Sequence, residues 1–283
     1  MQVHCPRDVV ADINYFPATG KTIETSSWKR RYLGISDENT RSMTIHDVRG
    51  KESQFELAKN GFQFIVLPDK ERSTVDDATI VRDYYPELEE LAKILTGATT
   101  AHVFNHVIRQ HSLPSDKGKL DDKGRWQDIP SGHPHVDYCG VPSLMEGTKN
   151  EVRVPPHIRK LFDTSSRFAF LGAWRPLKTL KKDPLAVADA TTVPDSDYQL
   201  RARSFPSGIK SGNYVMSHAD NEERHQWYYM SVMKPNEIVV FKGYDTNQDL
   251  PGWRCPHTAF VLPGTESLPT RESIEARIIC FWE

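Results

Sequence analysis

The sequence predicts a mainly β protein of the α+β class, built as a double-stranded β-helix (jelly roll) with a helical amino-terminal flank. Three observations lead to this class. Segments rich in β-branched and aromatic residues recur after residue 100, clusters of turn residues separate them, and only one long stretch has helical periodicity. Many strands with short polar connections and one helix are typical of a two-sheet sandwich or barrel.

One stretch, residues 75–95, has the periodicity of a helix. Its apolar side chains recur at spacings of three and four residues, which places them on one buried stripe. Gly97 follows as a suitable C-terminal stop, and Pro86 is expected to kink the helix or divide it in two. The apolar positions of the stripe are Ile80, Tyr84, Leu88, Leu91 and Leu95.

Five later segments have the composition of strands. They are residues 101–110, 167–177, 226–233, 237–241 and 274–282. Turn clusters separate them, and no boundary is sharp enough to define a second domain. We therefore expect one domain over residues 1–283, with an α+β flank over 1–98 and a jelly-roll core over 99–283. The polar segment 117–126 is expected to be a solvated loop, with a lid over a substrate as the alternative.

Composition and charge limit the possible partners. The 283 residues include 36 Lys and Arg against 38 Asp and Glu, so the net charge of −2 gives no overall basic field for nucleic acid or an anionic membrane. No apolar run approaches the roughly 18 residues that span a bilayer, and residues 1–10 lack the apolar stretch of a signal peptide. We expect a cytoplasmic protein with a small-molecule partner, and homo-oligomer formation is left open. The four cysteines are too scattered for a zinc knuckle or a dithiol motif.

Two H-x-D tripeptides occur among the 11 histidines, one from His135 to Asp137 and one from His218 to Asp220. The tripeptide is not specific by itself. On a strand, however, residues i and i+2 share a face, so an imidazole and a carboxylate at this spacing can bind one ion. A second histidine from a distant strand would complete a two-histidine, one-carboxylate triad, which leaves three positions open for non-haem Fe(II) chemistry.

Spacing along the chain selects the third ligand. The intervening strands of a jelly roll need roughly 40–50 residues. His257, which opens the apolar run PHTAFVLP, lies far enough after His135 for these strands but too close to His218. We therefore predict a metal site at His135, Asp137 and His257. The alternatives are a surface hydrogen-bonded pair for the first two residues and a core histidine for the third.

A second element follows His257 at the head of the last apolar strand. Arg271 and Ser273 form an R-x-S sequence there and would share one face. A guanidinium binds a planar carboxylate through two hydrogen bonds and a hydroxyl adds a further donor, so an acidic cosubstrate that chelates the iron could be anchored at this point. Arg277 on the same face is another pocket candidate, for which a buried ion pair is the alternative.

Further residues are candidates for the cosubstrate or substrate pocket. Tyr229 or Tyr228 could place a hydroxyl near the cosubstrate carboxylate, and Trp227 is a candidate for the substrate pocket. Core packing is the alternative for all three. Strand adjacency adds four pocket candidates, for which packing or surface ion pairs are equally open. They are Asn105, Arg109, Trp174 and Arg175.

Several segments resemble one known family. They are NGFQFIVLP at 60–68, HVDYCG at 135–140, AWRPL at 173–177, DPLAVAD at 183–189, HQWYYMSVMKPNEIVVFKGYDT at 225–246, and PHTAFVLP at 256–263 with RESIEARIICFW at 271–282. Through them the chain resembles the fungal cephem-methoxylase/gibberellin-desaturase-like family from about Thr44 to the carboxyl end. The segments at 225–246 and 256–263 are the most specific.

The resemblance implies an Fe(II)/2-oxoglutarate-dependent hydroxylase or desaturase that consumes O2 and tailors a small molecule, often in secondary metabolism. The residues that correspond to the iron ligands are His135, Asp137 and His257. Arg271 corresponds to the arginine that receives the far carboxylate of 2-oxoglutarate. One departure is Gln226, where the family motif has a basic residue between histidine and tryptophan.

The leading hypothesis is a single-domain dioxygenase that hydroxylates, desaturates or cyclises a small molecule. A jelly-roll metal protein of another class, such as a cupin-like isomerase or hydrolase, is one alternative, but it would leave the R-x-S sequence without a role. A non-catalytic binding module is the other. Nucleophile-elbow, P-loop and dinucleotide-binding fingerprints are missing from the sequence, which disfavours a hydrolase of that type, a kinase or a Rossmann enzyme.

Overall fold

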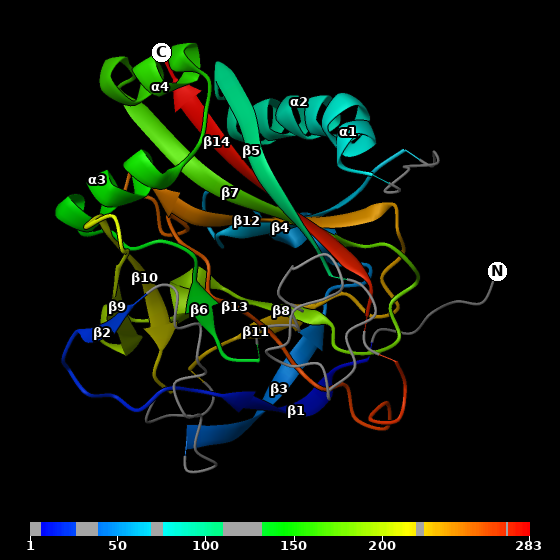
Figure 1. The fold of residues 1–283 in the computed structure, drawn as a ribbon. Helices are drawn as coiled ribbons and strands as arrows, with labels where there is room; N and C mark the ends of the chain where they lie inside the picture. The colour runs from blue at the N-terminus through cyan, green and yellow to red at the C-terminus, as the bar shows by residue number, and fades with distance from the viewer. Residues whose placement is uncertain (1–6, 27–38, 69–75, 110–131, 219–223, 270) are drawn as a thin grey trace.

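The computed structural model of the chain describes residues 7–26, 39–68, 76–109, 132–218, 224–269 and 271–283. Two β-sheets face each other, and the helices lie over the outer side and one end of the smaller sheet (Figure 1). The prediction of a mainly β chain arranged as a jelly roll is confirmed. The predicted loop or lid at 117–126 lies outside the described residues.

The smaller sheet has five antiparallel strands in the order β4-β12-β7-β14-β5. They are β4 (Phe62–Val66), β12 (Glu237–Asp245), β7 (Arg167–Pro176), β14 (Ser273–Trp282) and β5 (Thr100–Arg109). Alternate side chains point to opposite faces of the sheet. Those of the outer face pack against the amino-terminal helix around Leu88 and Ile278, and those of the inner face look toward the other sheet.

The amino-terminal helix consists of α1 (Asp77–Thr79), a π-helical turn (Ile80–Tyr84) and α2 (Tyr85–Thr96). The predicted helix is thus confirmed over the part that the structure describes. Pro86 lies in the first turn of α2, where its missing N–H group needs no partner, and the wide π turn before it absorbs the irregularity. Gly97 ends α2 in the left-handed conformation, with φ of 70°.

The larger sheet has nine strands in the order β1-β3-β11-β8-β13-β6-β10-β9-β2. They are β1 (Val9–Asn14), β3 (Thr40–Asp47), β11 (Trp227–Tyr229), β8 (Leu185–Ala188), β13 (His257–Ala259), β6 (His135–Val136), β10 (Lys210–Met216), β9 (Tyr198–Ser204) and β2 (Ile23–Ser26). Val187, His257, His135 and Val215 stand opposite one another on four adjacent strands. The row faces the smaller sheet, because the ring of His257 contacts that of Phe241 in β12.

Two apolar clusters fill the space between the sheets. One contains Trp174 and Phe241 of the smaller sheet together with Val187 of the larger sheet. The other contains Phe170 and Ile279, against which side chains of the helices at 142–151 and 156–164 pack. His257 contacts Phe241 of the first cluster, and Tyr138, next to Asp137, packs against the second, so these polar residues adjoin both clusters.

The sequence missed two helices, and the expectation of only one appreciable helix was wrong. They are α3 (Pro142–Glu151) and α4 (Pro156–Thr164), which lie at one end of the smaller sheet (Figure 1). Each begins with proline at its first position, where the fixed φ favours a helix start. The Pro155–Pro156 pair therefore forms the entry to α4.

The predicted strands agree with the structure except at their ends. Strand β12 continues beyond the predicted 237–241, and β11 is shorter than the predicted 226–233. The three described cysteines, Cys139, Cys255 and Cys280, are buried free thiols.

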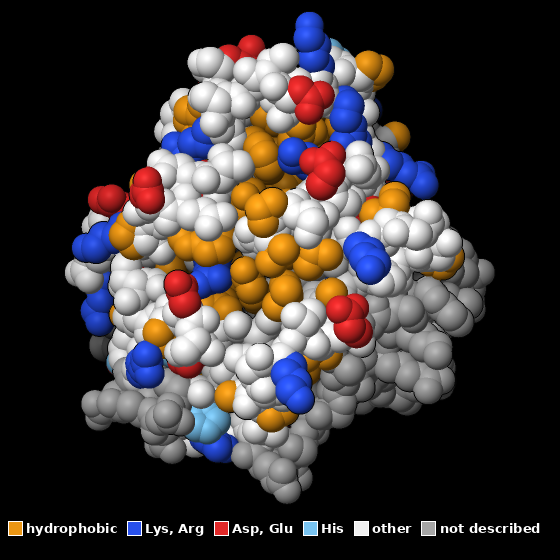
Figure 2. Space-filling view, turned by 90° about the vertical axis from the view of Figure 1, so that its left-hand side faces the viewer, with side chains coloured by type: hydrophobic (Ala, Val, Ile, Leu, Met, Phe, Trp, Pro, Cys, Tyr) orange, Lys and Arg blue, Asp and Glu red, His pale blue; other side chains and the backbone are white. Residues whose placement is uncertain are grey.

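Figure 2 views the side of the molecule on which α3, β9 and β2 lie in Figure 1. Hydrophobic side chains gather in the middle of this face, and acidic and basic side chains are scattered around them, so neither charge dominates. None of the helices in the described part of the chain is long and apolar enough to cross a membrane.

Candidate metal centre

Three side chains predicted from the sequence converge on the inner face of the larger sheet. His135 of β6 and His257 of β13 stand directly opposite each other in an antiparallel pair, with ring centroids 4.4 Å apart. Asp137 follows on the same side of the chain, and its Oδ1 lies 3.9 Å from Nε2 of His135. One ligand atom from each of the three residues lies within 4.8 Å of the others. This arrangement is that of a two-histidine, one-carboxylate metal site.

Backbone carbonyls orient both imidazole rings. Nδ1 of His135 lies 2.9 Å from the carbonyl oxygen of His133, and Nδ1 of His257 lies 3.2 Å from that of Cys255. A carbonyl oxygen only accepts hydrogen bonds, so each Nδ1 carries the proton and donates it. Each Nε2 then keeps a lone pair, which is the form of histidine that binds a metal ion.

Two glycines of the smaller sheet make room for these ligands. A Cβ atom on Gly172 would lie 2.3 Å from the ring of Phe241, whose centroid is 4.4 Å from that of His257. A Cβ atom on Gly243 would lie 2.7 Å from the ring of Tyr138, next to Asp137. Gly172 thus lets the Phe241 ring lie across its own sheet toward His257, and Gly243 lets Tyr138 approach the smaller sheet.

Electrostatics favour protonation states of His135 and Asp137 that would suit metal binding. Burial lowers the pKa of His135 well below its usual value, and the neighbouring His257 and His133 lower it further. Burial raises the pKa of Asp137, but the positive charge of Arg277 and the adjacent imidazoles outweigh this effect, and the pKa falls to about 2. A neutral imidazole and a carboxylate are the protonation states that a divalent cation requires.

The R-x-S sequence forms a second buried polar cluster. The Arg271 guanidinium lies over the ring of Trp174, 4.8 Å from its centroid, and donates Nη1–H to the carbonyl oxygen of Asp183. Its Nε and the Oγ of Ser273 are buried and have no partner among the described residues. Burial, and next the charge of Arg109, lower the pKa of Arg271 to about 9. A buried cation without a paired carboxylate fits an acidic ligand.

Charged residues continue along the inner face of β14 and β5. Nη1 of Arg109 lies 3.3 Å from Glu275, and Nη2 of Arg277 lies 3.5 Å from the same carboxylate. Asn105 stands opposite Arg277 and is exposed. These predicted pocket residues therefore share one face with Ser273 and lie across from the triad.

Other predicted residues lie elsewhere. The Tyr229 hydroxyl donates to the carbonyl of Arg7, and Nε1 of Trp227 donates to the Tyr15 hydroxyl, both on the other face of the larger sheet. Arg175 lies over the ring of Tyr84 on the outer face of the smaller sheet.

Tyr228 differs from Tyr229, because it stands opposite Val187 and so shares the row of His257. The structure thus brings the three triad residues together on the larger sheet, and it places Arg271 beside Trp174 and Ser273 on the facing side of the smaller sheet. It does not bring Arg175, Trp227 or the Tyr229 hydroxyl to the triad.

Sequence reasoning missed polar residues on β9 and β10. Arg201 and Arg203 alternate along β9, and Asn213 stands opposite Arg201 on β10. Burial, followed by the charges of Arg201 and Arg203, lowers the pKa of the neighbouring His133 to about 4. The available signal was the tripeptide Arg-Ala-Arg at 201–203, where both charges fall on one face of a strand.

The fold and this site define a class of protein. Two facing sheets hold two imidazoles with free Nε2 atoms and one carboxylate, and a buried arginine and serine offer donors nearby. This combination is that of a mononuclear non-haem iron oxygenase with an acidic cosubstrate. The donor set fits ferrous iron, since it contains no cysteine and leaves coordination positions open.

Comparisons with known proteins agree with this class. A family model described as an oxidoreductase/YMDC permease-like domain matches residues 11–281. Hydroxylase/desaturase efuI of Hormonema carpetanum is 34% identical over 268 residues, which cover 87% of this chain and 85% of the relative. Alpha-ketoglutarate-dependent dioxygenase phiK of a fungal species (strain ATCC 74256) is 31% identical over 271 residues, which cover 94% and 92%.

A solved structure has the same fold. The iron and alpha-ketoglutarate-dependent endoperoxidase NvfI aligns with a TM-score of 0.75 and 22% identity, over 97% of this chain and 98% of that one. The chain therefore belongs to the matched oxidoreductase family and, within it, to the fungal Fe(II)/2-oxoglutarate-dependent hydroxylases and desaturases. It is an enzyme that uses Fe(II), 2-oxoglutarate and O2 to oxidise a small molecule, and the resemblance found in the sequence is confirmed.

Proposed function

We propose that His135, Asp137 and His257 hold the ferrous ion of this oxygenase, and that Arg271 and Ser273 bind the far carboxylate of 2-oxoglutarate. The convergence of three ligand atoms within 4.8 Å is the observation that carries the proposal. The two Nδ1–H groups bonded to carbonyls support it, because they aim both Nε2 lone pairs at the same point.

When bound, ferrous iron supplies the dioxygen chemistry, driven by oxidative decarboxylation of 2-oxoglutarate to succinate and carbon dioxide. The protein's own contribution is to hold the ligands rigidly and to keep water out. Phe241 supports His257 from one side, and Tyr138, stacked on Phe170 at 4.5 Å, closes the other side beside Asp137. A substrate C–H bond held against such a site is oxidised, which yields a hydroxylated, desaturated or cyclised product.

The cosubstrate assignment rests on burial. Arg271 is 8% exposed and Ser273 is fully buried, yet each has a polar atom without a partner in the described parts of the chain. A carboxylate would accept hydrogen bonds from both groups and would remove this deficit. Trp174 underneath the guanidinium fixes its plane through a cation–π contact. Tyr228 remains a further prediction for this ligand.

We propose in addition that residues 1–283 form one oxygenase domain. Strands β1 and β3 extend the larger sheet and β4 forms an edge of the smaller sheet, although all three come from the amino-terminal third of the chain. A core that shares strands from both ends of the chain supports cooperative folding as one unit.

The proposal is tested by metal binding and turnover together. Mn(II) with 2-oxoglutarate should raise the melting temperature of the wild-type protein, since a ligand at a hundred times its dissociation constant adds about 2.7 kcal/mol. With Fe(II) and ascorbate, the protein should convert 2-oxoglutarate to succinate. His257→Ala and Asp137→Asn should abolish both effects.

A matched control is His157→Ala, which removes an exposed histidine of α4 and should change neither measurement. Stabilisation of the His257→Ala protein by Mn(II), equal to that of wild type, would contradict the assigned ligands. Metal binding without succinate formation in any condition would favour a jelly-roll metal protein of another class.

A further inference from the structure

A polar pair on β9 and β10 extends the triad along the larger sheet. Tyr214 and Val215 pair with Val136 and His135, so continuation of this antiparallel register places Asn213 opposite Asp137. Asn213 in turn stands opposite Arg201. Neighbouring strands are about 4.8 Å apart, which puts the Arg201 backbone on the order of 10 Å from Asp137 across the sheet. All three side chains share the inner face.

Both members of this pair have polar atoms without partners. Asn213 is 1% exposed, and its Oδ1 is buried without a hydrogen bond, although its Nδ2 donates to the carbonyl of Tyr214 at 3.1 Å. Nε of Arg201 is likewise buried and unbonded, and no carboxylate in the described ranges forms an ion pair with this guanidinium. Burial and the nearby Arg203 lower the pKa of Arg201 to about 10, and no acidic group in the described part of the chain opposes this shift.

The two groups define complementary chemistry in a ligand. Arg201 is only partly buried, but its Nε is shielded from water, so an anion that accepts its N–H groups would satisfy this guanidinium. The Asn213 amide oxygen requires a hydrogen-bond donor, so a fully deprotonated anion such as a phosphate would leave it unsatisfied. A carboxylate with a hydroxyl or N–H group a few bonds away satisfies both.

We propose that Arg201 and Asn213 recognise such a carboxylate with a nearby hydroxyl or N–H donor on the organic substrate, and so set its position relative to the metal. This inference rests on the proposed function, because it assumes a metal at the triad. The pair is separate from the proposed cosubstrate cluster in the opposite sheet. There, Ser273 is the first residue of β14 and Arg271 precedes it by two residues. The oxidised carbon would then lie several bonds from the carboxylate.

Three small probes separate the two contacts. 3-Phenylpropanoate carries the carboxylate, its methyl ester removes the charge, and 3-hydroxy-3-phenylpropanoate adds the donor. The protein is loaded with Mn(II) and saturating 2-oxoglutarate, so that the cosubstrate occupies its own positions. Binding near the metal is measured through the paramagnetic relaxation of the phenyl protons by NMR, and the rise in melting temperature with Mn(II) and 2-oxoglutarate is recorded separately.

In the wild-type protein the acid should bind about tenfold or more tightly than its ester, because a hydrogen bond to a charged group is involved. The hydroxy acid should bind more tightly still. Arg201→Met should remove the preference for acid over ester. Asn213→Leu should remove only the preference for the hydroxy acid. Arg82→Met, which removes an exposed arginine on the outer side of the smaller sheet, should leave both preferences unchanged.

Arg201→Lys keeps the charge but loses the planar fork, and it should retain a reduced preference for the acid. If Arg201→Met fails to fold, Arg201→Lys still tests whether Arg201 causes the preference for the acid. Equal binding of acid and ester by wild type, or an unchanged acid preference in the Arg201 variants, would overturn the inference while Mn(II) and 2-oxoglutarate still stabilise the protein. Absence of that stabilisation in wild type would instead contradict the metal site, and the inference with it.

Discussion

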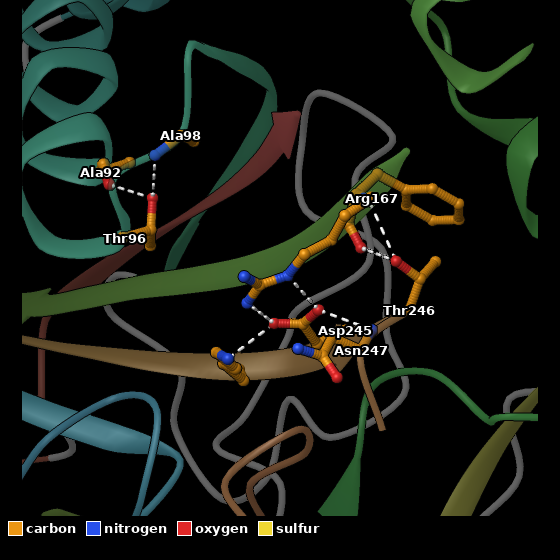
Figure 3. A network of polar contacts seen from close by, with 9 residues as sticks. Ala92, Thr96, Ala98, Arg167, Asp245, Thr246 and Asn247 are labelled. Carbon is orange, nitrogen blue, oxygen red and sulfur yellow. Dashed lines mark hydrogen bonds and ion pairs between the residues drawn. The ribbon is translucent and has the colours of Figure 1, made fainter. Parts of the chain in front are cut away.

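Two buried polar clusters of this protein differ in how completely their hydrogen bonds are made. At one end of the smaller sheet, Asp245 is fully buried and accepts bonds from Arg167 at 2.8 and 2.6 Å, from Lys242 at 2.6 Å and from the amide of Asn247 at 2.9 Å (Figure 3). Arg167 also stacks on Trp282, with its guanidinium carbon 3.9 Å from the ring centroid. Every charge of this cluster has a partner.

The inner faces of the two sheets show the opposite pattern. Arg271, Ser273, Arg201 and Asn213 each keep a buried polar atom without a partner in the residues that the structure describes. An unsatisfied buried donor or acceptor costs about 1–3 kcal/mol, so such a set destabilises the free protein. The cost is recovered when a ligand supplies the missing partners.

This difference separates structural polarity from binding polarity. The Asp245 cluster is internally paired at the end of a sheet, whereas the inner-face groups are those that we propose to bind carboxylates. The contrast is not absolute, because Arg175 on the outer face also has unbonded nitrogens, with its guanidinium 4.7 Å from the ring centroid of Tyr84. Location between the sheets and proximity to the triad must therefore accompany the missing bonds before a group is assigned to a ligand.

The largest effect on stability is expected at Asp245. Asp245→Ala leaves Arg167 and Lys242 without their shared anion, and breaking a buried ion pair in this way costs about 3–5 kcal/mol. Urea unfolding of the metal-free proteins measures the loss. Asp163→Ala, at an exposed position of α4, is the control and should have no effect. A loss below about 1 kcal/mol would show that the Asp245 cluster contributes little to stability. Its complete hydrogen bonding would then not indicate a structural role.

Gly172→Ala should have the next largest effect. The added methyl group would meet the ring of Phe241, which supports His257, and overpacking of a core costs about 1–3 kcal/mol. Displacement of the group that orients a ligand should also weaken Mn(II) binding about 10–100-fold. Unfolding by urea and titration with Mn(II) give the two values. Gly132→Ala has open space around the new Cβ atom and should change neither. Tight metal binding by Gly172→Ala would exclude the Phe241 contact as a support of the site.

Ser273→Ala tests an inner-face group that, unlike Asp245, should contribute little to stability. Its hydroxyl has no hydrogen-bond partner among the described residues, so its removal is expected to change the free energy of unfolding by less than about 0.5 kcal/mol or to raise it slightly. The rise in melting temperature on addition of 2-oxoglutarate to the Mn(II) protein should nevertheless become smaller. The same measurement on Arg271→Met should show a larger loss of cosubstrate binding. A Ser273→Ala protein with unchanged cosubstrate binding would leave the hydroxyl without the proposed role.

Much of the candidate site was accessible from the sequence because it depends on strand alternation and on chain order. His135 and Asp137 are two residues apart, and His257 begins a short apolar strand, so a jelly roll brings them to one face. Arg271 and Ser273 follow from the same alternation. These positions need no knowledge of register.

The remaining pocket depends on register and face, which the sequence does not encode locally. Trp174 and Arg175 are adjacent on one strand, so their side chains point to opposite faces and only one of them can face inward. In the structure Trp174 faces inward. Bulges shift the register between Lys242 and Tyr244 and again between Arg277 and Ile278. Arg201 was missed because its proposed role depends on β9 being two strands away from β6, and only the strand pairing of the folded chain shows this.

The last expected effect concerns pH and a third polar cluster, on the other face of the larger sheet. His225 lies between Asp197, 2.9 Å from its Nε2, and the Tyr15 hydroxyl, 3.1 Å from its Nδ1. Burial lowers the pKa of His225 below its usual value of about 6.5, against the opposing effect of Asp197. The folded state therefore holds this proton less tightly than the unfolded state. Its contribution to stability is complete above about pH 6.5 and is lost as the pH falls toward the lower pKa of the folded state.

His225→Gln removes this titration, so the stability difference between wild type and variant should shrink as the pH falls from 7 to 5, by less than about 1.4 kcal/mol per pH unit. Urea unfolding of the metal-free proteins at several pH values measures it, and the titration of the triad cancels because both proteins share it. A difference that stays constant with pH would mean that His225 keeps its ordinary pKa. The His225 cluster, in which the hydrogen bonds are made, would then tolerate a charged imidazole. Complete hydrogen bonding would no longer distinguish this cluster from the polar groups between the two sheets.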